Sequence, residues 1–448
     1  AAFHVASAVA LAAVRHVAAT HDDELARDVA VDLAVQTARL WAGRGHHTAA
    51  GFRIDGVTGP DEYTAVVDNN TYTNLMARKN LRAADELCER FPEQAARLDV
   101  TADERAGWRR AADRMVVPYN AELGVTEQSQ DFTRHAHWDF ESRGTARFPL
   151  DDHVHYVELY RRQVVKQADL VLALHAAPEE FTPEQRRRDF DYYEPLTVRD
   201  SSLSAPVQAV VAAEIGYVEL AYDYARECAL LDLCDLRGST DGGLHVASLA
   251  GAWTAVVTGI VGLRHDDDGL RLAPRLPSRL TRLALAVHHG DARARVEVRP
   301  DGVTYRLESG ERLRVVHGDG PCALAPARAG RPRTPRRPVA AFHVVSGHDG
   351  LDAAALAGVR DRTATLVVLM GVSQLARITA QALDAGADPA LPVAIVVNGS
   401  TPRPRVPRAP LGEGEERAAQ GGGRAPAIIV VGDVAAAGRL EPDPATVA

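Results

Sequence analysis

The sequence lacks the features of a secreted, membrane-spanning or metal-binding protein. Its 448 residues include only four cysteines (Cys88, Cys228, Cys234 and Cys322), which are widely scattered and form no C-x-x-C spacing. This pattern indicates a reducing compartment, so we predict a cytoplasmic location and no metal site. No apolar run reaches the length of a membrane span. The apolar opening, AAFHVASAVALAAVRHV, has no basic start and no clear cleavage site, and we interpret it as a helix rather than a signal peptide.

An excess of positive charge is also absent. The formal net charge is −9, which argues against nucleic acid as a general partner. The hydrophobic content of 46% and charged content of 25% are ordinary for a globular protein. A chain of 448 residues is long for one compact core, so the length predicts two or three domains.

Three sequence patterns and one linker follow one another along the chain. Residues 1–262 repeat apolar side chains at three- and four-residue steps between polar loops, which predicts a mainly α region built as a helical barrel or toroid. Residues 263–318 alternate apolar and polar side chains, which predicts a small antiparallel β domain. Residues 319–338 are rich in Pro, Arg and Ala and predict a linker. Residues 339–448 alternate strand-like and helix-like runs, which predicts an α/β lobe.

One polar stretch, GFRIDGVTGPDEYTAVVDNNTYTN from Gly51 to Asn74, is the first candidate site. Asp61 and Glu62 are adjacent, so one carboxylate is expected to reach a ligand while the other holds the loop. A glycosidic bond needs a protonated carboxyl group to release the leaving oxygen. Sugar hydroxyls need many short polar partners when they leave water. We predict those partners to be Asp68, Asn69, Asn70, Thr71 and Asn74. A surface turn that ends in a helix N-cap is the alternative interpretation.

Four segments in this order resemble glycoside hydrolase family 65, the inverting phosphorylases of the maltose, trehalose and kojibiose type. They are GPDEYTAVVDNNTYTN, YRRQVVKQADLVLALH, YYEPLTVRDSSLS and TDGGLHVASLAGAW. The resemblance covers residues 1–318 and implies a partial (α/α)6 barrel followed by a small β domain. It also implies the reaction: phosphorolysis of an α-glucosyl disaccharide to β-glucose 1-phosphate and glucose.

The family pattern also implies residue roles. Glu62 is the general acid, and inorganic phosphate attacks from the opposite face, so no second catalytic carboxylate and no cofactor are required. Lys166 and Gln167 match a pair that contacts glucose. The residues placed against phosphate are Ser201, Ser202, Gly243 and His245, with Arg199 as a further neighbour.

Each role has a structural alternative. Ser201 and Ser202 are also suitable caps for the helix that follows them, and His245 is equally suitable as a hydrogen-bonded core histidine. Lys166 is also suitable as a solvated helix residue, since lysine side chains are mostly exposed in proteins. Three aromatic residues are predicted to pack in the core rather than to stack on sugar: Tyr192, Tyr193 and Trp253.

The chain departs from the family pattern at its start. Members of the family carry a β-sandwich and the first barrel helices before the point that matches residue 1, including a Trp-Asp element that binds glucose. An incomplete barrel leaves apolar helix faces without partners and the sugar site without one wall. We therefore expect N-terminal truncation to impair the activity.

The tail, residues 339–435, resembles the C-terminal lobe of uroporphyrinogen-III C-methyltransferases. In that family the segment matching Leu369, Met370 and Gly371 lies against the methionine part of S-adenosylmethionine, and a glycine at a strand end lets a ligand approach the backbone. The alternative is an ordinary buried strand followed by a turn. The glycine-rich GxGPGD loop of the family is absent from the sequence. Half of a cofactor cleft buries little of a ligand, so we expect no methyl transfer and no cofactor unless the lobe were complete.

Three functions follow from these patterns: an α-glucoside phosphorylase, a glucoamylase-like hydrolase that uses a second carboxylate, and a methyltransferase fragment. The partners expected for the first are a disaccharide and phosphate, with a homodimer as a possible assembly. The choice among maltose, trehalose and kojibiose lies in loop shape and stays open. The junction between the family 65 part and the methyltransferase-like part is compatible with a working fusion, a rearranged gene or an assembly artefact.

Overall fold

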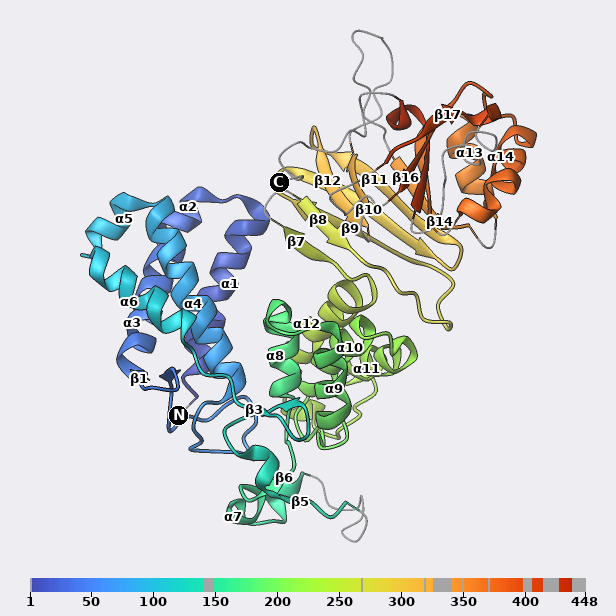
Figure 1. Cartoon of the computed structure of the whole chain (residues 1–448). Coiled ribbons are helices and arrows are strands. Elements are labelled where there is room, and N and C mark those ends of the chain that lie inside the picture. The colour runs from blue at the N-terminus through green and yellow to red at the C-terminus, as the bar shows by residue number, and fades with distance from the viewer. Residues whose placement is uncertain are drawn as a thin grey trace. The chain divides into compact units, whose positions relative to one another are not determined.

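The computed structural model contains two compact units, Ala1–Gly262 and Leu263–Ala448. It describes residues 2–140, 149–266, 269–317, 320–324, 341–347, 350–369, 371–397, 405–413 and 427–436. The division falls at the boundary between the predicted helical domain and the rest of the chain. Each unit is described below by itself (Figure 1).

The first unit is mainly helical. Its α-helices are α1 (His4–Thr20), α2 (Asp23–Leu25), α3 (Val31–Arg44), α4 (Thr71–Arg90), α5 (Pro92–Arg97), α6 (Ala102–Asp113), α7 (Tyr156–Leu159), α8 (Leu170–Ala176), α9 (Pro183–Tyr193), α10 (Ser204–Glu214), α11 (Val218–Leu230) and α12 (Val246–Thr254). Two π-helical segments, Ala26–Ala30 and Ala255–Ile260, continue neighbouring helices. Short strands lie in the loops: β1 (His46–His47), β2 (Phe52–Arg53), β3 (Tyr119–Asn120), β4 (Val125–Thr126), β5 (Ala136–His137) and β6 (Arg162–Gln163).

Helix α4 is the centre of the first group of helices and packs against α1, α3 and α6 (Figure 1). It begins where the Asn70 side chain accepts a hydrogen bond from the backbone N–H of Thr73, which is an ordinary N-cap. Its apolar side chains join the core formed by Trp41, Ile54, Leu81 and Trp108. Burial of this amphipathic face, rather than helix propensity, therefore stabilises the group.

Helix α10 is the centre of the second group and contacts α8, α11 and α12. Its residues Ala209–Ala213 are fully buried, as expected for a helix that is apolar on all sides. The close packing against α12 requires a small residue, because a Cβ atom on Gly251 would lie 2.4 Å from Cγ of Pro206.

The segment from Tyr156 to His175 differs from the continuous helix that its apolar spacing predicts. Only the four residues of α7 and the seven residues of α8 are α-helical. Between them the chain is extended, since Val165 N donates to Leu196 O and Val198 N donates to Val165 O, both at 2.9 Å. Pairing with a distant segment has overridden the local helical preference.

The second unit contains two sheets. Its strands are β7 (Arg264–Asp266), β8 (Gly269–Leu272), β9 (Leu283–His289), β10 (Ala292–Arg299), β11 (Gly302–Ser309), β12 (Leu313–His317), β13 (Gly320–Leu324), β14 (Ala341–Ser346), β15 (Ala364–Leu369), β16 (Pro392–Val397), β17 (Arg408–Pro410) and β18 (Ala427–Val431). One sheet has the order β17-β16-β18-β15-β14-β11-β10-β9, and the other has the order β13-β12-β8-β7. The pairs β14–β15 and β8–β12 are parallel, and the other pairs are antiparallel.

These sheets correct two predicted boundaries. The segment predicted as a linker from residue 319 contains strand β13, which pairs with β12. The predicted β domain and α/β lobe are not separate sheets, because β11 pairs with β14. Tyr305 lies opposite Phe342 at this junction, and their ring centroids are 4.6 Å apart. The cross-strand aromatic pair buries both side chains and joins the two predicted domains into one core.

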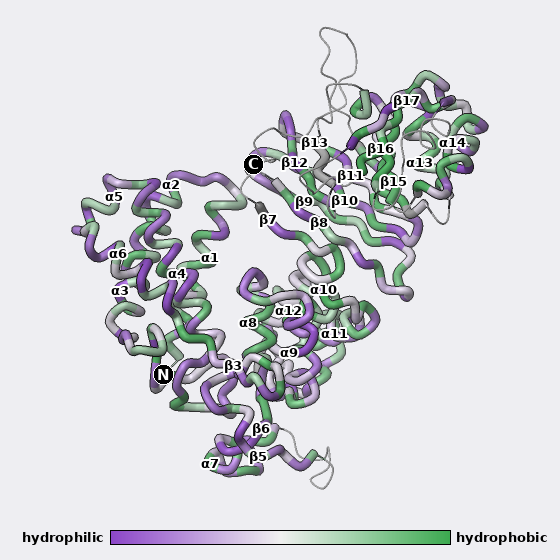
Figure 2. Tube along the Cα trace, viewed as in Figure 1, coloured by the Kyte–Doolittle hydropathy of each residue, from purple (hydrophilic) through white to green (hydrophobic). Residues whose placement is uncertain are grey.

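The strand and helix pattern predicted for the tail is present in the structure. Helices α13 (Ala353–Arg360) and α14 (Leu375–Asp384) pack with β15, β16 and β18 around one apolar core. Figure 2 shows these central strands as hydrophobic along their length. The chain is therefore a multidomain protein with a helical N-terminal region and a β-rich C-terminal region.

Candidate active site

The loop that carries Glu62 is held by its neighbour Asp61, which is fully buried. Asp61 Oδ1 accepts hydrogen bonds from the backbone N–H groups of Tyr63 at 3.1 Å and Lys166 at 2.8 Å. Its Oδ2 accepts from the Thr64 hydroxyl at 2.7 Å and from the Gln128 amide at 2.9 Å. Burial raises the pKa of Asp61 although these four donors oppose the shift. Asp61 thus holds the loop, as expected for one of the two carboxylates, whereas Glu62 is exposed. That Glu62 reaches a ligand stays a prediction.

A second buried carboxylate, Asp169, holds the other side of the loop. Its Oδ2 accepts from the backbone N–H of Asp61 at 3.1 Å, and both of its oxygens lie 3.1 Å from the Asn70 amide nitrogen. Burial, and then the nearby charge of Asp61, raise the pKa of Asp169 to about 8. Gly59 leaves room for this contact, because a Cβ atom there would lie 2.3 Å from Asp169 Oδ2.

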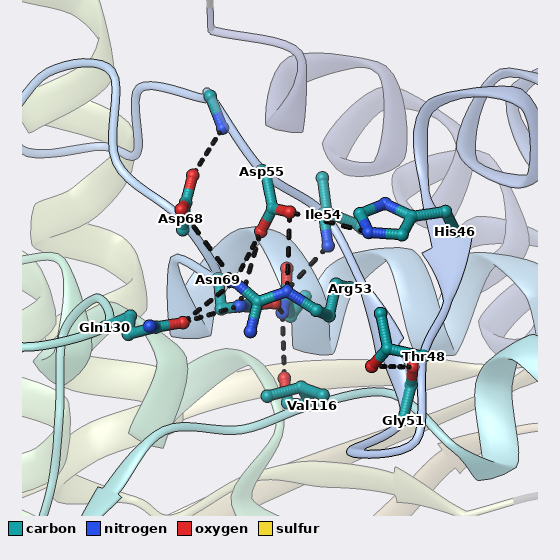
Figure 3. Close-up of polar contacts among 12 residues, drawn as sticks. His46, Thr48, Gly51, Arg53, Ile54, Asp55, Asp68, Asn69, Val116 and Gln130 are labelled. Atoms are coloured by element: carbon teal, nitrogen blue, oxygen red, sulfur yellow. Dashed lines mark hydrogen bonds and ion pairs between the residues drawn. The ribbon is translucent and has the colours of Figure 1, made fainter.

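The polar residues after this loop are structural and do not present their side chains to solvent. Asn69, Asn70, Thr71 and Asn74 are each at most 1% exposed, so the predicted role of these four residues as sugar partners is wrong. In the network that contains them, Asn69 Oδ1 accepts from Ile54 N (Figure 3). Asn74 Nδ2 donates to Val116 O.

Arg53 closes the same network from the solvent side. Its guanidinium donates to Asp55 Oδ1 and to Gln130 Oε1, both at 2.9 Å (Figure 3). Asp68, half exposed, accepts from the backbone N–H of Gly56 at 3.0 Å. These contacts tie together the two ends of the loop that carries Glu62.

Glu62 itself is 65% exposed and is paired with Lys166, whose Nζ lies 2.9 Å from Glu62 Oε2. The same ammonium group lies 2.9 Å from Asp151 Oδ2. Burial opposes the charged form of Lys166, but the hydrogen bonds to Asp151 and Glu62 outweigh it and raise the pKa of this lysine. Burial acts against the charge of Asp151 as well, and the Lys166 hydrogen bond lowers the pKa of that carboxyl group. Lys166 is therefore paired with two carboxylates and 19% exposed, and it is not a solvated helix residue.

Tyr63 connects this cluster to a third carboxylate. Its hydroxyl donates to Asp200 Oδ2 at 2.6 Å and accepts from the backbone N–H of Asp151 at 3.2 Å. Asp200 Oδ2 also accepts from the backbone N–H of Leu150 at 2.9 Å. Burial and the Asp200 carboxylate raise the pKa of Tyr63, which stays a neutral donor. The residue next to Asp200 is Ser201, so this chain of contacts leads from Glu62 to the predicted phosphate segment.

The neighbouring predicted residue, Gln167, holds the Glu62 loop from outside. Its side-chain amide donates to the carbonyl oxygen of Pro60. The structure thus brings Glu62, Lys166 and Gln167 together, and it shows the last of these in contact with the protein backbone.

The predicted phosphate residues Ser201 and Ser202 are both half-buried and lie just before α10. Ser201 Oγ accepts from the backbone N–H of Leu203 at 3.2 Å, a local turn of the capping type. No described residue forms a hydrogen bond with the Ser202 side chain. Arg199 is directed elsewhere: its guanidinium lies 3.3 Å from the Tyr224 hydroxyl and 3.7 Å from Glu227 Oε2.

The second predicted phosphate segment, containing Gly243 and His245, follows the loop after α11. Gly243 has φ of 128°, a backbone conformation that favours glycine. His245 Nδ1 lies 2.6 Å from Asp232 Oδ1, and its backbone N–H donates to Asp232 Oδ2 at 2.9 Å. Arg237 of the same loop donates to the backbone carbonyl of Arg199. This contact ties the two predicted phosphate segments together.

The aromatic predictions are confirmed in part. Tyr193 is 1% exposed, and its hydroxyl accepts from Gln128 N and donates to Thr126 O. Tyr192 is half-buried and donates to Gln163 Oε1. Trp253 is 60% exposed in the described chain, so the prediction that it packs in a core is wrong.

Sequence reasoning missed Asp151, Asp200 and Asp232 as members of the cluster. Asp200 stands directly before the quoted Ser-Ser pair, so a search for hydrogen-bond acceptors beside each motif would have found it. Asp232 gives no such signal, because only the return of the loop after α11 brings it to His245.

The predicted cofactor segment of the second unit gives a different result. Met370 lies outside the described residues. Gly371 is buried, and a Cβ atom there would lie 2.5 Å from Val368 Cγ1 and 3.3 Å from Ile378 Cδ1. Apolar side chains of the same lobe account for the need for glycine at this position.

Two further observations concern the described residues only. They contain no group of three or more His, Cys, Asp or Glu side chains arranged to hold a metal ion. Among their helices, none has both the length and the apolar character needed to cross a membrane.

Comparisons with known proteins agree with this arrangement. The model of the glycosyl hydrolase family 65 central catalytic domain matches residues 1–254, and the model of the C-terminal domain of that family matches residues 263–324. The chain belongs to glycosyl hydrolase family 65. A model of tetrapyrrole (corrin/porphyrin) methylases matches residues 304–414, so this family 65 chain also contains a tetrapyrrole methylase segment. The C-terminal-domain match and the methylase match overlap in residues 304–324, which include most of β11, the strand that pairs with β14.

Similar proteins within family 65 differ in how they are described. An "Uncharacterized glycosyl hydrolase" of Mycobacterium leprae is 50% identical over 69% of this chain and 39% of its own length. An alpha,alpha-trehalose phosphorylase of Geobacillus stearothermophilus is 38% identical over 70% of this chain and 42% of its own length. A solved structure described as "Putative kojibiose phosphorylase from human microbiome" is 26% identical, with a TM-score of 0.66, over 71% of this chain and 43% of its own. The chain thus spans about two fifths of the length of the relatives that it matches.

Proposed function

We propose that the first unit is the later part of an (α/α)6 barrel and carries the acid and phosphate side of an inverting α-glucoside phosphorylase. The products are β-glucose 1-phosphate and glucose. Similarity to a trehalose phosphorylase supports the substrate class, an α-glucosyl disaccharide. Because the chain spans about two fifths of such relatives, we expect the activity to be impaired in this chain alone.

The observation that carries the proposal is the pairing of Glu62 with Lys166 on a loop held by buried Asp61. A general acid must hold its proton until the leaving oxygen takes it, and an adjacent cation favours the carboxylate, so such a cation stabilises the state after proton transfer rather than the protonated state before it. The Lys166 ammonium group, 2.9 Å away, supplies that charge. The loop contacts restrict the position of Glu62, which is the requirement for proton transfer in a defined direction.

The nucleophile in this proposal is inorganic phosphate, held near Ser201, Ser202, Gly243 and His245. Two contacts support the grouping of these residues: Tyr63 bonds to Asp200, next to Ser201, and Arg237 bonds to Arg199. Lys166 and Gln167 are proposed to contact the glucose unit. No cofactor is required, because phosphate dianion is already a nucleophile.

The experiment is a product assay with trehalose, maltose or kojibiose, with and without phosphate. We expect β-glucose 1-phosphate to form only when phosphate is present, and to fall to background in Glu62→Gln. Product formation that is independent of phosphate would overturn the phosphorylase assignment.

A hydrolase is the second candidate, and one observation favours it. Asp151 shares the Lys166 ammonium group with Glu62, and its side chain is 41% exposed. A second carboxylate near the acid is what an inverting hydrolase needs to activate water. Loss of phosphate-independent glucose release in Asp151→Asn would support this candidate over the first.

For the second unit we propose no methyl transfer by this chain. The packing of Gly371 against Val368 supports an apolar structural role for the segment that resembles the cofactor contact. Titration with S-adenosylhomocysteine tests this, and saturable binding would overturn it. A cytoplasmic location and a homodimer remain predictions.

A further inference from the structure

Asp232 and His245 form a half-buried pair that the proposed reaction does not by itself require. The Asp232 side chain is 5% exposed and the His245 side chain is 26% exposed. One carboxylate oxygen lies 2.6 Å from His245 Nδ1, while the other accepts the backbone N–H of His245 at 2.9 Å. The carboxylate therefore holds both the ring and the backbone of one residue.

This geometry determines the tautomer of the neutral imidazole. A carboxylate accepts hydrogen bonds and cannot donate one, so Nδ1 carries the proton and Nε2 keeps its lone pair. No described residue forms a hydrogen bond with Nε2, and a quarter of the side chain is exposed. The free edge of the ring therefore offers an acceptor to a ligand.

A hydrogen-bond acceptor at a phosphate site can distinguish phosphate from other anions. Hydrogenphosphate carries one P–OH group that can donate to Nε2, whereas sulfate carries no proton near neutral pH and meets only a lone pair. A site with a forced acceptor therefore distinguishes two anions that have the same shape and charge.

We propose that Asp232 is a positioning residue that holds His245 as a hydrogen-bond acceptor and so selects hydrogenphosphate over sulfate. This inference rests on the proposed function, because it takes His245 to be a phosphate ligand. Asp232 is expected to contact no substrate, and its effect acts through the imidazole.

The nearest comparable carboxylate is Asp235, three residues further along the same loop. Its Oδ1 accepts the backbone N–H groups of Ser239 at 2.9 Å and Thr240 at 3.1 Å, and it holds a turn rather than the ring. Asp235→Asn keeps an acceptor for this turn and is the matched control.

The first measurement needs no variant. Long-range 1H–15N NMR of the histidine-labelled full chain at about pH 8, where an ordinary imidazole is neutral, reports the tautomer of each ring. His245 is identified among the 17 histidines as the signal lost in His245→Gln. We expect the proton on Nδ1. A proton on Nε2 would overturn the inference.

The second measurement is titration of the same signal with inorganic phosphate and with sulfate. We expect phosphate to bind at least roughly tenfold more tightly than sulfate, since a hydrogen bond to a charged group has about that effect on affinity. In Asp232→Asn the amide donates to Nδ1 and the ring proton moves to Nε2, where both anions can accept it, so the preference for phosphate is expected to be lost. Asp235→Asn is expected to keep the wild-type preference.

The outcomes separate the two proposals. If neither anion shifts the His245 signal in the wild-type chain, the placement of phosphate fails and the inference fails with it. If phosphate binds and Asp232→Asn keeps the wild-type ratio, the inference fails while the proposed function stands. Thermal denaturation of each variant checks that the fold is retained.

Discussion

The loop that carries Glu62 and the strand end at Gly371 both match functional segments of known families, but they are built differently. Around Glu62 the buried side chains are polar, and each of Asp61, Asn70 and Asp169 forms several hydrogen bonds. Around Gly371 the neighbours are Val368, Ile378 and Ile429. Buried carboxylates and amides lower stability unless they are fully paired, whereas apolar packing needs no such arrangement. The comparison shows that the first segment is held by paired polar groups, while the second is a packed apolar core.

The largest expected effect concerns the reaction itself. Glu62→Gln removes the transferable proton while the side chain keeps its size and its place in solvent. We expect the rate of glucose 1-phosphate formation to fall by about 10²–10⁴-fold, the usual contribution of a general acid. The melting temperature of the first unit is expected to be unchanged, because Glu62 is 65% exposed. If Glu62→Gln keeps more than a tenth of the wild-type rate, Glu62 is not the general acid, and the Glu62 loop no longer differs in this respect from the Gly371 segment.

Asp61 is expected to show the reverse behaviour. Asp61→Ala leaves four donors without their acceptor inside the protein, and we expect the free energy of unfolding to fall by about 3 kcal/mol or more. Chemical denaturation of the full chain measures this. Asp68→Ala is the control, since Asp68 is half exposed, and we expect a change below about 0.5 kcal/mol. Equal effects of the two substitutions would contradict the structural role of Asp61.

The Glu62 loop also shows how much can be predicted from the sequence alone. The motif GPDEY predicts Glu62 as the acid because the spacing of four long segments is specific, and helical periodicity predicts the packing of α4 and α10. The roles of Asn69, Asn70 and Thr71 were predicted wrongly, because residue type alone does not distinguish a polar group that faces a ligand from one that is buried and paired.

Long-range pairing explains the other differences. The extended segment around Lys166 forms because Val165 pairs with residues near Thr197, which no local pattern reveals. The single sheet of the second unit forms through β11 and β14, which are separated in sequence by the predicted linker. Local composition predicted the elements on either side correctly but not their pairing.

The buried carboxylate Asp169 gives the polar loop a pH dependence. Its pKa is raised from an ordinary 3.8 to about 8, so the folded protein holds a proton that the unfolded chain releases. Stability from this group is therefore present at low pH and is lost as the pH rises between about 4 and 8. We expect the first unit to melt at a lower temperature at pH 8 than at pH 6, and Asp169→Asn to reduce this difference, because an amide does not titrate. If the melting temperature of Asp169→Asn falls between pH 6 and pH 8 as much as that of the wild type, other groups cause the pH dependence of stability.

The smallest expected effect tests the apolar side of the comparison. Gly371 has φ of −95°, which any residue can adopt, so a substitution acts through packing alone. Gly371→Ala places a methyl group 2.5 Å from Val368 Cγ1, and we expect a loss of about 1–3 kcal/mol in the stability of the second unit. Gly412→Ala is the matched control, since its nearest neighbour would lie at an ordinary 3.4 Å. The double variant Gly371→Ala with Val368→Ala removes the clash and is expected to recover part of the loss. Without such recovery, the glycine would be required by something other than Val368, and a ligand-binding origin of the segment would again need to be considered.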